Sequence, residues 1–476
     1  MSTLLLPWST VLVALPLSTA LVLSRLANRR RARKLAMISG VLSLAIALGL
    51  LLAVAGLEGE HVLLVDPSAL PGLAPRPLLG VDLLSAPILV LVALVSLASI
   101  WGTSVTEAPA RTLTRIAALQ AATYLALLSQ HAALFVAAWA LTLIPVVLEL
   151  RARGASRMAA VFFAYQGAGL VVLVGSLLVF GGGAAIFERS GEQLELGCLV
   201  GVGIAALARQ GLFPLHSWVP SLHEQASPGL TALTLLPQLG GYLLLRVLVE
   251  SPGAASSEVF QVLLVLGAAS AVYAALLGVV QLDLRRGVGW LAASQSALVI
   301  CGLVTQNAVG LSGGLLLCLS SALALVGLLL TVSAIEARFG PVDLSQPRGL
   351  AGRTPTLGVF FLLLGFASVG LPGSLGFVAE DLLFHGALEM SPAVGLGLVV
   401  ATAINGFSVL RLYYRAFQGG RPALPRVEDA LPRERLVLLS LVLLLLVGGL
   451  WPRALVETHA RAASEIRSLS SHAAGD

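Results

Sequence analysis

Titratable and helix-breaking side chains interrupt an otherwise apolar chain at two places, and the first is the block 213–228. It contains His216, His223 and Glu224 together with three prolines. Histidine gains and loses a proton near neutral pH, so this combination is suited to proton transfer through bound water. Ionisable groups at membrane depth are costly and usually functional, and prolines there indicate an interrupted helix beside a polar pathway. We therefore predict that His216 and His223 belong to a proton path, with Glu224 as an accessory group.

Two other interpretations of this block stay open. The two histidines could instead hydrogen-bond the backbone groups that an interrupted helix leaves free. His216, His223 and Glu224 are also zinc ligands by residue type, but the flanking prolines and the lack of a neighbouring cysteine disfavour this. We predict no metal site.

The second interruption is Gly370-Leu371-Pro372-Gly373, which is followed by Glu380, Asp381 and His385. Because strong acids are rare in apolar segments, we predict that Glu380 carries protons, with Asp381 as its companion and His385 as an accessory group. Arg209 lies in the apolar run ahead of the first block, and we predict that it belongs to the same proton path. Its guanidinium is effectively never deprotonated, so it can bias the local field or hold an anion without carrying the proton itself.

The composition defines the class of protein. Hydrophobic residues make up 57% of the chain, charged residues 11%, and the mean hydropathy is +0.94, whereas about a quarter of a soluble domain is charged. The chain is therefore a polytopic membrane protein, and its net charge of +5 reflects basic loops rather than nucleic-acid binding. Cys198, Cys301 and Cys318 lack the spacing of disulfides or thiolate metal sites. No nucleotide, flavin or iron–sulfur signature is present, so we predict no cofactor.

Apolar runs long enough to cross a bilayer as helices recur about fourteen times. They predict an all-α membrane fold with no soluble domain between spans. The run 355–388 contains the glycine and proline interruption and is predicted to be a broken helix. The predicted spans are 3–24, 35–56, 81–103, 112–129, 131–150, 158–181, 195–213, 226–248, 258–280, 287–304, 309–334, 355–388, 393–411 and 434–451.

Basic loops predict the orientation. Arginines and a lysine within 25–34, arginines within 151–157 and the pair 285–286 all fall on one side if the spans alternate. By the positive-inside rule this side is the cytoplasm. Both termini are then predicted on the outer, periplasmic side of a bacterial-type inner membrane.

An ordered set of motifs carries a family resemblance over roughly residues 75 to 415. Together they look like the antiporter-like membrane subunits of respiratory complex I and of related hydrogenase and multi-subunit cation antiporter complexes. The ordered set is more specific than any one motif. The motifs are Gly80-Val81-Asp82-Leu83-Leu84-Ser85-Ala86-Pro87, Pro214-Leu215-His216-Ser217-Trp218-Val219-Pro220, Gly240-Gly241-Tyr242 followed by Arg246, Asp283-Leu284-Arg285-Arg286, and Gly370-Leu371-Pro372-Gly373 followed by Gly376-Phe377 and Glu380-Asp381.

The resemblance implies a fourteen-helix fold with two inverted five-helix repeats, each holding a broken helix. It places N-terminal helices in 1–111, the core in 112–415 with repeats near 112–248 and 258–411, and a C-terminal helix with a short tail in 416–476. Other membrane subunits and hydrophilic subunits are implied as partners. If the complex is of the NADH-quinone oxidoreductase type, this chain is at most a non-redox subunit, and the redox groups lie on its partners.

The sequence departs from the usual proton relay of this family. Ala140 stands where the fifth-span glutamate belongs and Arg209 where the seventh-span lysine belongs. Gln238 falls near the eighth-span lysine and is predicted to be an accessory residue of the path. The eleventh-span histidine falls near Ser321, and a polar position of the tenth span falls near Gln295. Alanine cannot titrate, and arginine keeps its charge, so the relay has lost members around the first interruption.

Two further acids are expected to be structural. Asp82 stands at the entrance of a span and is interpreted as a cap or interface residue. Glu149, beside Arg151 and Arg153, is interpreted as a member of a surface ion pair rather than a displaced version of the missing fifth-span acid.

Two functions of different classes remain open. The first is a proton-translocating subunit of an energy-coupled membrane complex, and the second is a scaffold subunit that keeps the fold without conducting. Membrane subunits of proton-driven inorganic-carbon uptake complexes form a variant of the first. The retained histidines, arginine and glutamate favour conduction.

Overall fold

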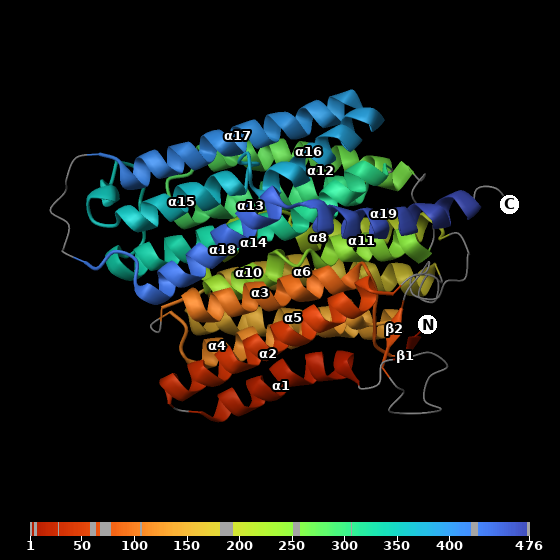
Figure 1. Ribbon diagram of the computed structural model, residues 1–476, viewed down its shortest axis with the longest axis horizontal. Helices are drawn as coiled ribbons and strands as arrows, with labels where there is room; N and C mark the ends of the chain where they lie inside the picture. The colour runs from red at the N-terminus through yellow and green to blue at the C-terminus, as the bar shows by residue number, and fades with distance from the viewer. Residues whose placement is uncertain are drawn as a thin grey trace.

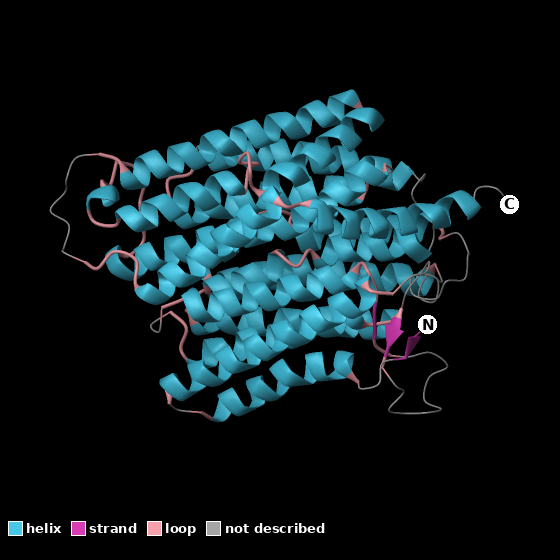
Figure 2. Ribbon diagram, in the orientation of Figure 1, coloured by secondary structure: helices cyan, strands magenta, loops and turns pink. Residues whose placement is uncertain are grey.

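A computed structural model describes residues 2–3, 7–26, 28–57, 63–66, 78–104, 107–180, 194–250, 258–305, 307–419 and 427–473. The helices run side by side along a common direction and form one bundle (Figure 1). Apart from a small patch of strands at the end near the N-terminus, the described residues are helices and short connections (Figure 2). The predicted all-α membrane fold is confirmed.

The N-terminal part consists of long apolar helices that reverse direction at short connections. Within lipid a helix satisfies its own backbone hydrogen bonds, so such runs fold as helices. The helix that begins at Arg29 is capped by Asn28, whose Oδ1 accepts from the N–H groups of Arg30 and Arg31. The helices are α1 (Trp8–Arg25), α2 (Arg29–Ala55), α3 (Ser85–Gly102), α4 (Ala110–Leu128), α5 (Ala132–Ala152) and α6 (Ser156–Val179).

Three short strands form a sheet at one end of the bundle. β2 (Leu64–Val65) lies between β1 (Ser2–Thr3) and β3 (Gly80–Val81). β1 and β2 are parallel, whereas β2 and β3 are antiparallel. The sheet ties the N-terminus to the segment that enters α3.

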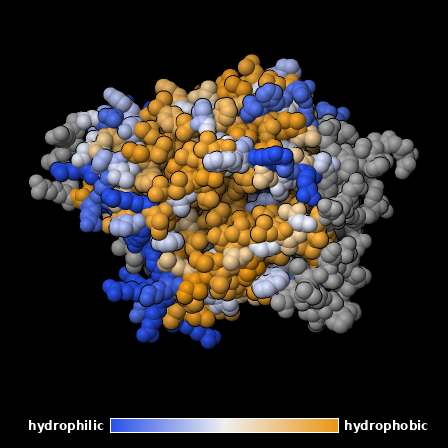
Figure 3. Space-filling view, in the orientation of Figure 1, coloured by the Kyte–Doolittle hydropathy of each residue, from blue (hydrophilic) through white to orange (hydrophobic). Residues whose placement is uncertain are grey.

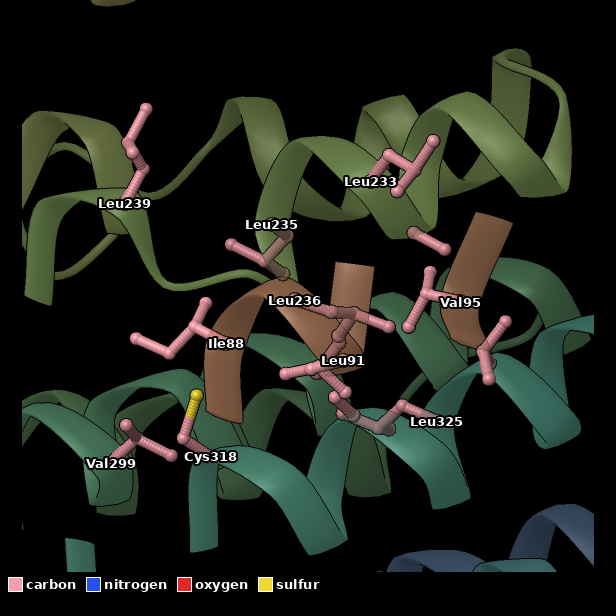
Figure 4. Packing of buried hydrophobic residues seen from close by; sticks show 14 of the residues in the cluster. Ile88, Leu91, Val95, Leu233, Leu235, Leu236, Leu239, Val299, Cys318 and Leu325 are labelled. Carbon is pink, nitrogen blue, oxygen red and sulfur yellow. The ribbon is translucent and has the colours of Figure 1, made fainter. Parts of the chain in front are cut away.

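The middle of the chain contains two interruptions. α8 (Leu196–Gln210) is followed by the short helix α9 (Trp218–Gln225), which confirms the predicted break. A further break, which the sequence analysis missed, separates α10 (Pro228–Leu235) from α11 (Leu239–Glu250). Figure 4 shows Leu235, Leu236 and Leu239 at this break, within a buried apolar cluster that also contains Leu91 and Cys318.

The second half contains the other predicted break, between α15 (Pro355–Ala367) and α16 (Leu375–Met390). α12 (Glu258–Val279), α13 (Leu284–Leu303) and the long α14 (Ala308–Phe339) precede it. A 3₁₀ turn, η2 (Leu350–Gly352), leads into α15. α14 packs against α13 and α16 of the same half, and it also contacts α3 and α10 from earlier in the chain.

The C-terminal part ends in a helix where the sequence analysis expected a short tail. α17 (Pro392–Phe417) and α18 (Pro432–Leu450) are followed by α19 (Arg453–Ala473). The first part of α19, to Ser464, is bent by 74° relative to α18. α19 packs on α14 and α11. Charged residues kept this helix out of the predicted spans, but one apolar face is enough to hold it on the bundle.

Apolar side chains cover the middle of the face shown in Figure 3, and charged ones gather at the end where α2 begins. Within the described residues, nine helices are long and apolar enough to span a membrane, or ten if α18 and the start of α19 count as one. Broken spans divide into helices that are too short for this test, so the predicted number of fourteen stays a prediction. The α10–α11 stretch is wholly buried and α14 nearly so, which places the core around them.

Candidate functional site

The first break places Arg209 at the buried end of α8. The helix ends at Gly211, which is left-handed with φ of 66°, and a Cβ there would lie 2.2 Å from Val219. Trp218 of α9 donates to the carbonyl of Ala208, 3.1 Å away, and so holds the two helices together. Proline at position 214 and this packing prevent the helix from continuing.

Arg209 is a buried cation with a neutral partner. Its Nη1 donates to Gln166 Oε1 over 3.3 Å, and its guanidinium lies 5.4 Å from the ring centroid of Trp139. Nε has no hydrogen-bond partner, and among the described residues no carboxylate lies within ion-pair distance. The carbonyl end of α8 and the aromatic face offset part of the charge. Ala140, next to Trp139, cannot supply the missing acid.

The unpredicted break builds a polar cluster around Gln238, whose φ is 51°. Ser296 of α13 donates to Gln238 Oε1 over 3.3 Å. In the amide orientation that satisfies both groups, Gln210 Nε2 donates to the same oxygen over 3.0 Å, and Gln210 Oε1 accepts from the N–H groups of Leu239 and Gly240. The last residue of α8 therefore caps the start of α11 and joins the two breaks.

The two histidines of the first block have different surroundings. His223 is buried, and its Nδ1 lies 2.9 Å from the carbonyl oxygen of Val219. His216 lies among the rings of Phe213, Tyr273 and Trp290, with centroids 5.1 to 5.9 Å away, and its Nδ1 has no partner. The two imidazoles thus have different contacts, and among the described residues no group of three metal-ligating side chains is found.

The second break positions Glu380. Its carboxylate lies against the turn, since a Cβ on Gly370 would be 2.4 Å from Glu380 Oε2. Glu380 is 4% exposed, and its Oε1 has no hydrogen-bond partner. Gln295 of α13 interacts with this carboxylate without reaching hydrogen-bond geometry, and both of its amide atoms are buried and unpartnered. Glu380 of α16 therefore faces α13.

α13 carries a run of polar residues that links these groups. Successive side chains on a helix point about 100° apart. Ser294 accordingly meets Asn405 of α17, whose Nδ2 donates to it over 2.8 Å, while Gln295 faces Glu380 and Ser296 faces Gln238. The sequence analysis recognised Gln295 alone. Three polar residues in a row within an apolar span were the signal for the other two.

Three other predicted residues lie at the surface of the chain. Asp381 and His385 point outward, with side chains 57% and 69% exposed and 3.5 Å apart. Glu224 is 40% exposed and lies 3.6 Å from Arg286. None of them reaches the buried line through α13, so their assignment to the path stays a prediction.

Two acids outside this line are held by buried ion pairs. Glu149 accepts from Arg115 over 2.6 Å and from Arg153 over 2.7 Å, and it is 1% exposed, so the expectation of a surface pair is wrong. The carboxylate turns inward because α4 brings Arg115 beside it. Asp82, ahead of α3, pairs with Arg246 over 2.6 Å.

The surroundings of Asp82 favour its charged form. Burial by itself raises its pKa, but Arg246 and two hydrogen bonds from Ser85 outweigh burial and hold the pKa below its usual value. The main-chain N–H of Ser85 donates to Asp82 Oδ1 over 2.8 Å, which agrees with the expected role at the start of α3.

A membrane bundle in which broken helices present buried polar groups to one neighbouring helix, α13, defines a polytopic membrane protein with a buried polar line. Comparison with known proteins agrees. The family model described as NADH:quinone oxidoreductase/Mrp antiporter, TM, matches residues 90–405. The chain belongs to this family, which confirms the resemblance seen in its motifs.

Individual relatives cover nearly the whole chain. NAD(P)H-quinone oxidoreductase chain 4 1 of a Synechococcus species is 30% identical over 493 residues, 95% of this chain and 91% of that protein. A chain of the Mrp complex from a Dietzia species has a TM-score of 0.86 at 21% identity, covering 97% of this chain and 99% of that chain. A chain of respiratory complex I from Thermus thermophilus has a TM-score of 0.84 at 24% identity, with the same coverage. These structures share the fold.

Proposed function

We propose that this chain is a proton-translocating, antiporter-like membrane subunit of a multi-subunit, energy-coupled complex related to respiratory complex I. Membership in the family supports this, as do relatives named as quinone oxidoreductase chains. The observation that carries the proposal is the polar run of α13, which faces Gln238 with Ser296 and Glu380 with Gln295. It supplies a buried polar connection between the breaks of the two halves.

Along this connection Glu380 is the group that takes and releases the proton. Gln295 and Ser296 do not titrate, but they can orient water between Glu380 and the Gln238 cluster. Buried polar atoms without a partner cost about 1–3 kcal/mol each. Several such atoms lie along this line, and ordered water is the usual partner of groups like these. A chain of water and side chains then moves protons without a metal or redox group on this subunit.

Arg209 acts as a fixed positive charge at the first break. Because it stays protonated, it repels a proton that approaches along α8 and so favours placement of the proton on Glu380. Its hydrogen-bond partner Gln166 is neutral, so among the described residues no carboxylate cancels that field. His223 is the titratable group of the same break.

The arrangement in the membrane follows from the charge distribution. We place the end rich in arginine, where α2 and α13 begin, in the cytoplasm, by the positive-inside rule. Both termini then lie on the opposite side. The two halves, near 112–248 and 258–411, each contribute broken helices to the path.

The test is proton uptake by the full chain in liposomes under an imposed membrane potential, followed with a pH-sensitive dye. Glu380→Gln and Arg209→Ala are expected to abolish uptake, and Gln295→Leu to reduce it strongly, while all three proteins still insert and fold. Gln120→Leu is the matched control, since Gln120 is equally buried but bonds Ser96 and Tyr124. Wild-type uptake in Glu380→Gln would refute the proposed path.

A non-conducting scaffold is the second candidate. The observation that favours it is that three buried polar residues at the first break and at the α10–α11 break, Arg209, Gln210 and Gln238, supply no readily titratable group. If the chain assembles with its partners but neither the wild type nor any variant takes up protons, the scaffold function is the correct one.

A further inference from the structure

A separate group of titratable side chains lies at the basic end of the bundle. Arg285, in the first turn of α13, places Nη2 2.6 Å from Glu336 Oε2 on α14 and 3.3 Å from Glu107 Oε1 in the α3–α4 connection. Ser333 Oγ donates to the other carboxylate oxygen of Glu107. Three segments that are distant in sequence thus meet at one guanidinium.

This cluster has an excess of negative charge. Two carboxylates share one cation, and Asp283 adds a third negative charge near Glu336. The side chains of Arg285 and Glu336 are only 6% and 11% exposed, so water screens the repulsion poorly. Ionising both of two close carboxylates costs free energy where water screens poorly, so one bound proton stabilises the cluster. Glu107 is 20% exposed and gives the proton a way in from solution.

Arg285 also connects the acids to the first break. Its Nη1 donates over 3.3 Å to the carbonyl of Ala226, one of the two residues between α9 and α10. The positive charge of Arg285 also acts electrostatically on His223 of α9. α9 packs closely on α13, since a Cβ at Gly289 would lie 3.0 Å from His223 Cβ.

The imidazole of His223 is oriented to accept a proton. With Nδ1 2.9 Å from the carbonyl of Val219, that nitrogen must carry the hydrogen, because a carbonyl only accepts. Nε2 is then left with its lone pair.

We propose that Glu107, Glu336 and Arg285 form a proton-loading site that takes a proton from the solution at the basic end and delivers it towards His223. The carboxylate receives the proton from hydronium, which releases water, and the attraction to Arg285 weakens. The proton then passes through water to His223 Nε2, and the carboxylate is ionised again. This inference rests on the proposed function, since it supplies the entrance of the same path.

Other charged groups around the site bind main-chain atoms or lie at the surface. Arg153 donates to the main-chain carbonyl of Glu107 over 2.9 Å, and Asp283 caps the first turn of α13 through the N–H of Arg286. Arg286 itself faces Glu224 at the surface. The proposed proton is therefore held between the carboxylates of Glu107 and Glu336, which share the guanidinium.

The test compares Glu336→Gln with Glu336→Asp and Glu107→Gln in the full chain. Infrared difference spectra between acid and neutral pH report protonated carboxyl groups directly. We expect Glu336→Gln to lose one carboxyl signal and the pH dependence of proton uptake into liposomes, and Glu336→Asp to restore both. Glu107→Gln, at the more exposed position, tests the site should Glu336→Gln fail to fold.

Glu434→Gln is the matched control. Glu434 of α18 is 3% exposed and lies away from the breaks. It pairs over 2.7 Å with Arg338, which lies near the end of α14, the helix that carries Glu336. Equal effects of Glu434→Gln and Glu336→Gln on uptake, or a wild-type spectrum and pH profile in Glu336→Gln, would overturn the loading site. If Glu380→Gln stops uptake while Glu336→Gln keeps the wild-type pH dependence of uptake, the proposed function stands and only the loading site fails. A wild type without uptake refutes the function, and the carboxyl titration still decides the site.

Discussion

Replacement of Gly370 by alanine tests how Glu380 is positioned. Gly370 has φ of 75°, where an L residue costs about 1–2 kcal/mol. An added Cβ would lie 2.4 Å from Glu380 Oε2, and ordinary contact begins at 3.4 Å, so the carboxylate must move away from the turn. Misplacement of a reacting group on this scale costs on the order of 100-fold in rate. We expect Gly370→Ala to fold with modest loss of stability and to lose nearly all proton uptake.

Gly373→Ala separates the two effects. Gly373 has φ of 87° in the same turn, and a Cβ there meets nothing within 4 Å. The Gly373→Ala variant should also lose about 1–2 kcal/mol of stability, because its backbone strain is similar. It should keep its proton uptake. Thermal unfolding in detergent and uptake in liposomes measure the two quantities on the same samples. Equal uptake by the two variants would refute the idea that Glu380 must occupy its place against the turn.

Two further predictions concern the buried ion pairs. Asp82→Asn leaves Arg246 without its carboxylate and should destabilise the chain by about 3–5 kcal/mol. The pKa of Asp82 is held below its usual value, so the ion pair stabilises the fold fully when the pH is above that usual value. This stabilisation disappears as the pH falls through the lowered pKa of Asp82. The stabilities of wild type and variant should therefore converge in acid unfolding. Glu149→Gln leaves Arg115 and Arg153 without a carboxylate and should cost a similar about 3–5 kcal/mol without changing uptake per folded molecule. A loss of uptake in the folded protein would instead make Glu149 a member of the path.

The breaks at 211–217 and 368–374 were predictable from the sequence because their cause is local. Proline removes a donor, and glycine takes backbone angles that other residues avoid. The break at Gln238 was missed even though Pro237 precedes it. Its left-handed residue is stabilised by Gln210 and Ser296, which lie on other helices.

The position of an acid in a span does not reveal which way it points. Glu380 and Asp381 are neighbours in the sequence, yet one is 4% exposed and the other has a side chain that is 57% exposed. A helix turns by about 100° per residue, so adjacent residues face different neighbours. Glu149 shows the same limit, because its inward orientation depends on Arg115 of the preceding helix.

The sequence by itself determined that this chain is a membrane bundle of the antiporter-like family with two interrupted helices, since apolar length and proline and glycine positions act within single segments. Tertiary structure alone decided that Ser296 and Gln295 connect Gln238 with Glu380, and that Arg285 gathers Glu107 and Glu336. Those relations are distances between helices far apart in the chain, and they are set by how the apolar faces of the helices pack.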